Sequence, residues 1–196
     1  MNAQDWISAA QTLGCSVAAI KAVAEVEGGG VGFSSVNGHV QPIILFEPHV
    51  FWRELKKRGI DPAKHTAGNG DILYEKWGTR PYPSGQVLRY AQLDKAARIN
   101  RDAALCSASW GKFQIMGYHW QSCGCVSLQD FINAMYRDEA SHLRCFVHLV
   151  KSWGLADELK RKDWTAFARA YNGASYAVHG YHRKLAAAYD KYALQR

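Results

Sequence analysis

Two glutamates stand near the end of one predicted helix, directly before three consecutive glycines. The helix is expected over residues 17–27, with Ser16 as its N-cap. At 100° per residue, Glu27 falls close to the angle of Ile20 and continues the apolar face, so it points inward. Glu25 falls on the solvent side, where its spacing predicts an ordinary surface ion pair with Lys21. Of the two acids, Glu27 is the one placed to do chemistry.

The position of Glu27 predicts a carboxyl group that keeps its proton near neutral pH. Burial disfavours the charged form, and the negative end of the helix dipole does the same. A carboxyl with a raised pKa is what a general acid requires. The alternative is a structural glutamate satisfied by backbone donors or an arginine. The three glycines favour the catalytic interpretation, because one glycine is enough to end a helix and three suggest a close approach to the backbone.

A second candidate segment, residues 109–117, holds one amide among apolar neighbours between two glycines. The amide is Gln114, and the aromatic residues beside it are Trp110 and Phe113. Aromatic rings stack on the apolar face of a sugar, and amides bond its hydroxyl and acetamido groups. The segment is therefore a candidate sugar-binding element, although Gln114 could equally be a satisfied amide of the core.

A third segment, residues 170–173, ends a predicted helix with an aromatic hydroxyl and an amide, Tyr171 and Asn172. These are again groups that bind sugars, and we count both residues as candidate substrate contacts. Asn172 has a simpler alternative role as the cap of its helix.

A second carboxylate that could act together with Glu27 has two candidates in the sequence. Glu47 is the first candidate, since it lies between a predicted strand and a helix that begins near Pro48. There it could act on the substrate or only complement the helix dipole, and its spacing slightly favours a structural or site-shaping role. Asp71, in a long loop, is a weaker candidate. Without a second carboxylate, water or the acetamido group of the substrate must complete the reaction.

Charge and composition exclude several other functions. The 196 residues carry a net charge of +7, which favours anionic partners in general: nucleic acid, an anionic membrane surface or a bacterial wall. The basic residues are scattered and no motif is suited to a nucleic-acid groove, so we expect no nucleic-acid partner. No His-Glu-x-x-His or comparable ligand set indicates a zinc amidase or peptidase.

The five cysteines are predicted to be free thiols. Their number is odd, and the N-terminus has neither the basic stretch nor the apolar core of a signal peptide. Cys123 and Cys125 are separated by one glycine, which is too short for zinc-ribbon spacing. We therefore expect neither a metal site nor a cofactor, and the pattern assigns the cysteines no role.

The elements that must position these residues are mostly short helices. Caps and glycines predict helices that start near Asn2, Ser16, Pro48, Gln86, Asn100, Ser127, Glu139, Asp163 and Gly180, and a short one from Ser109 into Met116. One hairpin is expected at Asn37-Gly38, with an outgoing strand through Val40 to Phe46. The loop over residues 60–85 is long enough to line a site. The fold class is thus α+β, predominantly helical, in a single domain over residues 1–196.

Taken together, these segments resemble the goose-type lysozyme and lytic transglycosylase superfamily, and within it the N-acetylmuramidase domain of phage endolysins. The resemblance covers about residues 10–189 and rests on an ordered set of motifs. They are Ala22-Val23-Ala24-Glu25-Val26-Glu27, Ile44-Leu45-Phe46-Glu47-Pro48-His49, Ser109-Trp110-Gly111 through Met116-Gly117, and Phe167-Ala168-Arg169-Ala170-Tyr171-Asn172-Gly173.

The resemblance implies a lysozyme-like fold and cleavage of peptidoglycan between N-acetylmuramic acid and N-acetylglucosamine, with Glu27 as catalytic acid. Two departures stand out. Gly28 occupies the position where the superfamily commonly has a serine, and a separate wall-binding module is not expected. The alternatives are a lytic transglycosylase that forms 1,6-anhydro products, and a glycan-binding module without catalysis, which would not need an inward Glu27.

The expected partners follow from the same resemblance. Peptidoglycan glycan strands are the expected substrate, and no apolar run in the sequence approaches a membrane span. The protein is expected to remain in the cytoplasm of the host bacterium until a holin releases it to the periplasm and its peptidoglycan. A monomer is expected.

Overall fold

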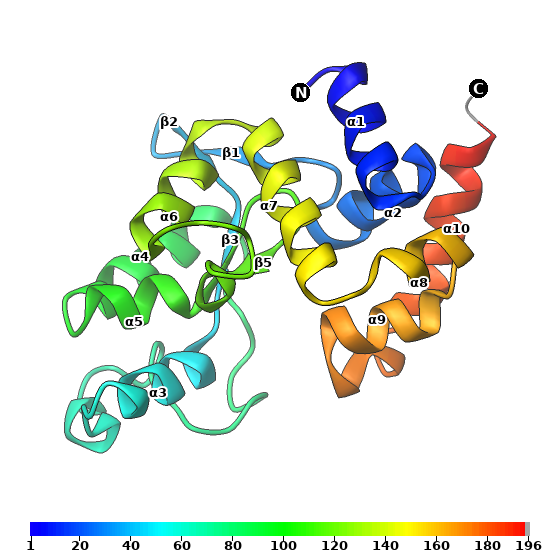
Figure 1. Ribbon diagram of the computed structural model, residues 1–196. Helices are drawn as coiled ribbons and strands as arrows, with labels where there is room; N and C mark the ends of the chain where they lie inside the picture. Colours follow the sequence, from blue (N-terminus) through cyan, green and yellow to red (C-terminus); the bar gives the residue numbers. More distant parts are fainter. Residues whose placement is uncertain (195–196) are drawn as a thin grey trace.

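The computed structural model describes residues 1–194. Figure 1 shows α3, α4, α5 and α6 on one side of the molecule and α1, α2, α8, α9 and α10 on the other, with the small sheet and α7 between them. The α-helices are α1 (Ala3–Leu13), α2 (Val17–Gly28), α3 (Pro48–Lys57), α4 (Gln86–Ala97), α5 (Arg101–Cys106), α6 (Leu128–Arg137), α7 (Glu139–Ser152), α8 (Ala156–Arg161), α9 (Trp164–Asn172) and α10 (Tyr181–Ala193). Short 3-10 helices are η1 (Pro62–His65), η2 (Gly117–His119) and η3 (Ala174–Ala177).

The predicted starts of α1 and α2 are confirmed by capping contacts. Asn2 caps α1 and, with Asp5, forms a complete capping box, while Gly14 ends that helix in a left-handed conformation. Ser16 caps α2 by accepting a hydrogen bond from the amide of Ala19 at 3.2 Å. Local sequence therefore decides where the helices that carry the site begin and end. Within residues 1–194, no single helix is both long and apolar enough to cross a membrane, although α1 and the sharply angled α2 pass such a test when taken together.

The strands form two small sheets rather than one hairpin. β1 (Phe33–Val36) and β2 (His39–Pro42) make the predicted hairpin, with Val36 opposite His39 across Asn37-Gly38. The outgoing strand does not continue to Phe46 as expected. Instead, β3 (Ile44–Phe46) joins a separate antiparallel sheet in the order β3-β4-β5, with β4 at Ala108–Trp110 and β5 at Ile115–Met116.

The prediction of a short helix from Ser109 into Met116 is wrong. Residues 108–116 form the tight β4–β5 turn, in which Gly111 and Gln114 both have left-handed backbone conformations, with φ of 67° and 47°. Such conformations interrupt a right-handed helix. The strand pairing with β3, some 65 residues earlier, stabilises the alternative: Trp110 pairs with Ile44, and Ala108 pairs with Phe46.

The end of α2 packs directly against this turn. Gly28 is buried, and a Cβ atom added to it would overlap the carbonyl oxygen of Lys112 and lie 2.9 Å from its carbonyl carbon. A side chain at residue 28 would therefore push the helix and the turn apart. The close approach gives a physical reason for glycine at residue 28.

A buried polar network fixes the other side of the turn. The amide of Lys112 donates to His142 Nδ1 at 3.1 Å, and His142 Nε2 contacts the carbonyl oxygen of Met135 at 2.7 Å. The Lys112 ammonium donates to the carbonyl oxygen of Gly30 and, at 3.0 Å, to Glu139 Oε1. Burial lowers the pKa of His142, which suits a neutral ring that accepts at Nδ1 and donates at Nε2. The turn is thus bonded to both α6 and α7.

We expect Gly28→Ala to destabilise the fold more than Gly29→Ala. Overpacking at residue 28 should lower the free energy of unfolding by about 2–3 kcal/mol, because the added methyl group meets rigid backbone. Gly29 has a left-handed φ of 63° but open space around a Cβ, so only about 1–2 kcal/mol of backbone strain is expected there. Urea unfolding of both variants measures the difference. Equal destabilisation would contradict the close-contact argument.

Candidate active site

A cleft of about 1080 Å³ opens between the two groups of helices. One wall comes from β3, α3, η2 and the loop that contains Trp77 and Tyr82, and the other from the end of α9, η3 and the start of α10. The polar and aromatic residues that line the cleft include Glu47, His49, Arg53, Trp77, Tyr82, Tyr118, His119, Trp153, Tyr171, Asn172, His179 and Tyr181.

Glu27 lies near the end of α2, just outside the residues that line the cleft, and is held by a residue of the cleft wall. Asn172, the last residue of α9, donates from Nδ2 to Glu27 Oε1 at 2.8 Å. Burial raises the pKa of the Glu27 carboxyl to about 7, against smaller opposing effects of the Asn172 hydrogen bond and the charge of Lys184. The side chain remains partly exposed. Glu27 is therefore a carboxylic acid that holds its proton up to neutral pH and is fixed in orientation by an amide.

Glu47 lines the cleft itself and is a second carboxyl with a raised pKa. Burial raises its pKa to about 7, while the hydroxyl of Tyr82, which donates to Glu47 Oε2, and the charge of Arg53 act against the shift. His49 Nδ1 lies 3.3 Å from the same oxygen, and burial lowers the pKa of His49. Glu47 makes no side-chain capping bond to α3, although it occupies the N-cap position. Its side chain is directed to Tyr82 and the cleft.

The charges of both carboxyl groups affect the pKa of one tyrosine, Tyr181. Burial is the main cause that raises the pKa of the Tyr181 hydroxyl, and the charges of Glu27 and Glu47 raise it further. Tyr181 itself lines the cleft.

Two of the predicted substrate-binding residues line the cleft. They are Tyr171 and Asn172. Asn172 is hydrogen-bonded to Glu27, and the hydroxyl of Tyr171 donates to the carbonyl oxygen of Phe113 at 2.7 Å. Gln114 is outside the lining, and its amide is used within the turn. It accepts from Ser109 Oγ at 2.9 Å and donates to the carbonyl oxygen of Gly111 at 2.9 Å. The structure places Gln114 as a satisfied amide that shapes the turn.

Trp110 and Phe113 lie in the core rather than on the cleft surface, so the expectation that they contact substrate is not met here. Phe113 is fully buried and stacks on Phe146 with ring centres 4.3 Å apart. Trp110 is 1% exposed, and its indole donates to the carbonyl oxygen of Leu105 at 3.1 Å. Apolar aromatic residues between glycines fit a core position as well as a binding surface. The sequence alone therefore could not distinguish these two roles for Trp110 and Phe113.

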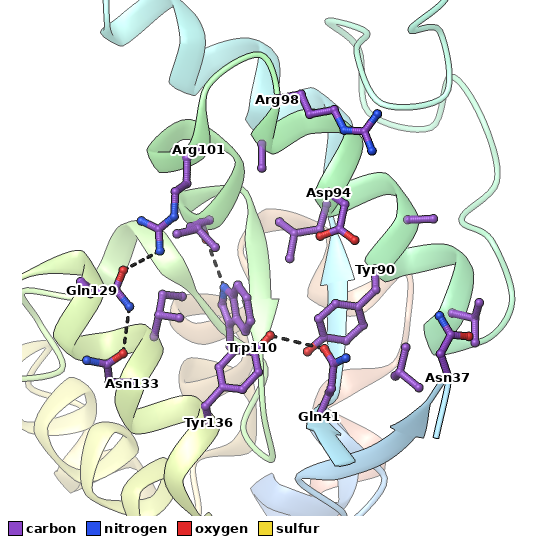
Figure 2. Close-up of a pocket in the computed structure, with 17 residues that line it drawn as sticks. Asn37, Gln41, Tyr90, Asp94, Arg98, Arg101, Trp110, Gln129, Asn133 and Tyr136 are labelled. Carbon is purple, nitrogen blue, oxygen red and sulfur yellow. Dashed lines mark hydrogen bonds between the residues drawn. The ribbon is translucent and has the colours of Figure 1, made fainter. Parts of the chain in front are cut away.

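Trp110 instead lines a second pocket, of about 810 Å³, whose lining includes neither Glu27 nor Glu47. Figure 2 shows this pocket between the β1–β2 hairpin, which contributes Gln41, and helices α4 and α6. Arg101 donates to Gln129, and Gln129 donates to Asn133 at 2.8 Å, along one wall. Glu47 and Asn172, the hydrogen-bond partner of Glu27, line the cleft described above and not this pocket, so that cleft is the candidate active site.

Sequence reasoning missed several aromatic residues of the cleft: Trp77, Tyr118, Trp153 and Tyr181. The only signal available for Trp77 and Tyr82 was the length of the loop over residues 60–85, which predicted a site without naming side chains. Asp71, in the same loop, forms an exposed ion pair with Lys95 at 2.5 Å and does not line the cleft.

The predicted surface pairing of Glu25 is corrected. Glu25 bonds Lys191 of α10 at 2.7 Å, whereas the Lys21 ammonium lies over the rings of Trp6 and Tyr192. Because α2 packs against α10, Lys191 lies beside Glu25 although it is 166 residues later in the chain. Across residues 1–194, no group of three or more His, Cys, Asp or Glu side chains is arranged to hold a metal ion.

Comparisons with known proteins agree with this geometry. A model of the family described as N-acetylmuramidase (Muramidase) matches residues 16–193. The crystal structure of an endolysin of the Burkholderia phage AP3 is similar over 98% of this chain and 71% of that one, with 36% sequence identity and a TM-score of 0.82. No curated protein sequence gives a significant match.

Glu27→Gln should stabilise the fold at and above neutral pH and have little effect in acid. The folded carboxyl has a pKa of about 7, against 4.5 as its ordinary value. Between these values the folded state holds a proton that the unfolded state has lost, so the wild type loses stability as pH rises. Glutamine never ionises and avoids this loss, and a gain in Tm of roughly 2–6 °C is expected on the alkaline side.

Glu25→Gln is the matched control, because the hydrogen bond from Lys191 lowers the pKa of Glu25 and the sign of the effect reverses. This variant should be equal to or slightly less stable than the wild type at neutral pH. Thermal unfolding across the pH range measures both. A Tm difference between Glu27→Gln and wild type that does not grow from acid to neutral pH would show that Glu27 is not desolvated.

Proposed function

The chain belongs to the N-acetylmuramidase family and is a peptidoglycan hydrolase, and we propose that it cleaves the β-1,4 bond between N-acetylmuramic acid and N-acetylglucosamine. The observation that carries this proposal is the Glu27 carboxyl, held by Asn172 at the cleft with a pKa raised to about 7. The similarity to a phage endolysin supports a role in lysis of a bacterial host.

In the proposed mechanism, Glu27 donates its proton to the glycosidic oxygen as the bond to the sugar lengthens. Asn172 fixes the carboxyl by bonding Oε1. Donation of the proton neutralises the leaving alkoxide, and the sugar ring develops oxocarbenium character. The raised pKa keeps a large fraction of Glu27 protonated at the pH of a bacterial wall, which is the condition for a general acid.

Glu47 is proposed as the second carboxyl. In its ionised form it would stabilise the positive charge on the sugar ring or activate the attacking water. Tyr82 donates to the same carboxyl and would favour that ionised form. The sequence left Glu47 between a catalytic and a site-shaping role, and its place in the cleft wall with no capping bond to α3 supports the catalytic one.

The cleft aromatics are proposed to hold the glycan strand. Trp77 is 57% exposed and lines the cleft, and Trp153 and Tyr181 line the same space. Each ring offers an apolar face on which a pyranose can stack. The net charge of +7 adds a general attraction to an anionic wall. Synthesis in the host cytoplasm, release by a holin and a monomeric state are further parts of the proposal and come from the family resemblance.

Glu27→Gln should reduce lytic activity by about 10²–10⁴-fold without unfolding the protein. Glutamine keeps the shape of the side chain but cannot donate a proton to the leaving oxygen. Turbidity loss of chloroform-treated Gram-negative cells measures activity, and circular dichroism checks the fold. Glu25→Gln, which loses one surface ion pair worth roughly 0.2–1 kcal/mol, should keep wild-type activity. A folded, fully active Glu27→Gln would mean that another group is the acid.

The products should be those of hydrolysis. If water attacks the sugar, soluble fragments of purified peptidoglycan carry reducing N-acetylmuramic acid ends. Mass spectrometry distinguishes them from 1,6-anhydro ends, which are lighter by one water. Fragments with only anhydro ends would assign the chain to the lytic transglycosylases and would leave Glu47 without the proposed role.

A further inference from the structure

The pocket lined by Trp110 is large enough for a small ligand, and the proposed function does not use it. Its volume of about 810 Å³ lies within the range of about 300–1,000 Å³ that is common for ligand sites. Helices α4 and α6 form two of its walls, and the β1–β2 hairpin contributes a third (Figure 2). Within residues 1–194, none of the residues that line this pocket also lines the cleft, so the two cavities are separate.

Aromatic rings supply the apolar part of this pocket. Trp110 and Tyr90 are almost fully buried, and both use their polar atoms in bonds to the backbone, the Tyr90 hydroxyl with the carbonyl oxygen of Pro42 at 2.7 Å. Tyr136 of α6 is 45% exposed, and its ring centre lies 6.2 Å from that of Trp110. An exposed ring that packs on a buried one offers a supported apolar face, on which a pyranose can stack.

A row of polar side chains on the α6 wall supplies hydrogen-bond donors. Arg101 donates to Gln129 Oε1, and Gln129 Nε2 donates to Asn133 Oδ1 at 2.8 Å. Because Asn133 Oδ1 accepts this bond, its amide nitrogen is left to donate to a ligand. Gln41 of the hairpin is oriented in the same way, since its Oε1 accepts from the Tyr136 hydroxyl at 3.4 Å. The amides are thus held in place with their donor ends available.

The α4 wall adds a carboxylate and a guanidinium. Asp94 and Arg98 are one helical turn apart, and both are exposed and line the pocket. Among the lining residues, all of which the structure describes, no hydrogen bond involves the side chain of Asp94, Arg98 or Asn37 (Figure 2). A carboxylate accepts from hydroxyl groups, and a guanidinium donates to oxygen atoms. Because their charges are opposite, this wall favours a polar ligand with little net charge over a polyanion.

We propose that this pocket is a second, non-catalytic sugar site that binds an N-acetylated sugar unit of a peptidoglycan strand. The pyranose stacks on Tyr136, the amides of Asn133 and Gln41 donate to its acetamido and hydroxyl oxygens, and Asp94 accepts from its hydroxyl groups. The identity of the polymer rests on the proposed function. The sugar chemistry of the pocket rests on the aromatic, amide and charged groups that line it.

A sugar bound in this pocket would keep the cleft close to the wall. Trp110 pairs with Ile44 of β3, and Glu47 follows the end of that strand, so one small sheet connects the pocket to the cleft. Two sites on one chain that bind the same polymer raise the effective concentration of glycan at each site. This contribution differs from the general attraction of the net charge of +7, which salt screens.

The test follows the backbone amide signals of isotope-labelled, full-length Glu27→Gln by NMR while the neutral tetramer of N-acetylglucosamine is added. This background slows cleavage of the probe. Signals of residues 90–98 and 129–136 should shift until they saturate, with a Kd in the millimolar range that does not change with salt. Signals of cleft residues such as Trp153 report binding at the cleft in the same titration, so the two sites are measured independently.

Variants of the pocket assign the site. Tyr136→Ala and Asn133→Ala, each combined with Glu27→Gln, should weaken binding at the pocket by about five-fold or more and leave the shifts at the cleft unchanged. Gln121→Ala, which removes an exposed amide outside both cavities, is the matched control and should change neither site. Circular dichroism checks that each variant is folded. Undiminished binding at the pocket in both folded variants would contradict the assigned contacts.

The outcomes separate this proposal from the proposed function. Shifts at the cleft without shifts at the pocket would overturn the second site alone. Shifts at the pocket without shifts at the cleft would support it and count against a glycan strand in the cleft. If the free peptide of peptidoglycan shifts the pocket signals and the sugar tetramer does not, the pocket is a peptide site and the sugar assignment is wrong.

Discussion

The close contact between Gly28 and the carbonyl group of Lys112 determines where the acid of this site can lie. Glu27 immediately precedes Gly28, so any movement of the helix end moves the carboxyl. The turn over residues 111–114 is itself held on its far side by His142 and Glu139. Tyr171 then ties α9 to the same turn through the carbonyl oxygen of Phe113. Asn172, the next residue, therefore reaches Glu27 from an element fixed to the same point.

This arrangement explains how the fold retains two poorly solvated carboxyl groups. At neutral pH, Glu27 and Glu47 each oppose folding, because the folded state raises the pKa of both. Other contacts must offset this loss of folding free energy. The Lys112–Glu139 ion pair and the hydrogen bond from the Lys112 amide to His142 lie behind the turn. That layer contains no cleft residue. The two carboxyl groups that destabilise the fold lie at the cleft, and the contacts that stabilise it lie behind the turn.

The sequence predicts the parts of this structure whose determinants are local. Asn2, Ser16, Ser127 and Asp163 each cap the helix expected after them, and Asn37-Gly38 forms the expected hairpin. The inward direction of Glu27 follows from helical periodicity within eleven residues.

The parts that escaped prediction depend on contacts between distant segments. The strands β4 and β5 are stable because β3 pairs with β4 across some 65 residues, so the local signal of Ser109 as a helix cap was misleading. The hydrogen bond from Tyr82 to Glu47 spans 35 residues, and the ion pair between Glu25 and Lys191 spans 166. Gln114 is the clearest case, because its sequence context fits a core amide and a sugar ligand equally, and its bonds to Ser109 and Gly111 form only in the folded turn.

The three-stranded sheet also links the two carboxyl groups. β3 ends at Phe46, so its register with β4 sets the position of Glu47, which follows directly. The amide of Gly111 donates to the carbonyl oxygen of Ile43 at 2.8 Å, which joins the start of β3 to the turn that supports Glu27. Because side chains alternate along a strand, a shift of one residue would exchange the two faces of β3. The separation between Glu27 and Glu47 is therefore set by backbone hydrogen bonds, and substitutions of cleft side chains should alter sugar binding before they alter the spacing of the carboxyl groups.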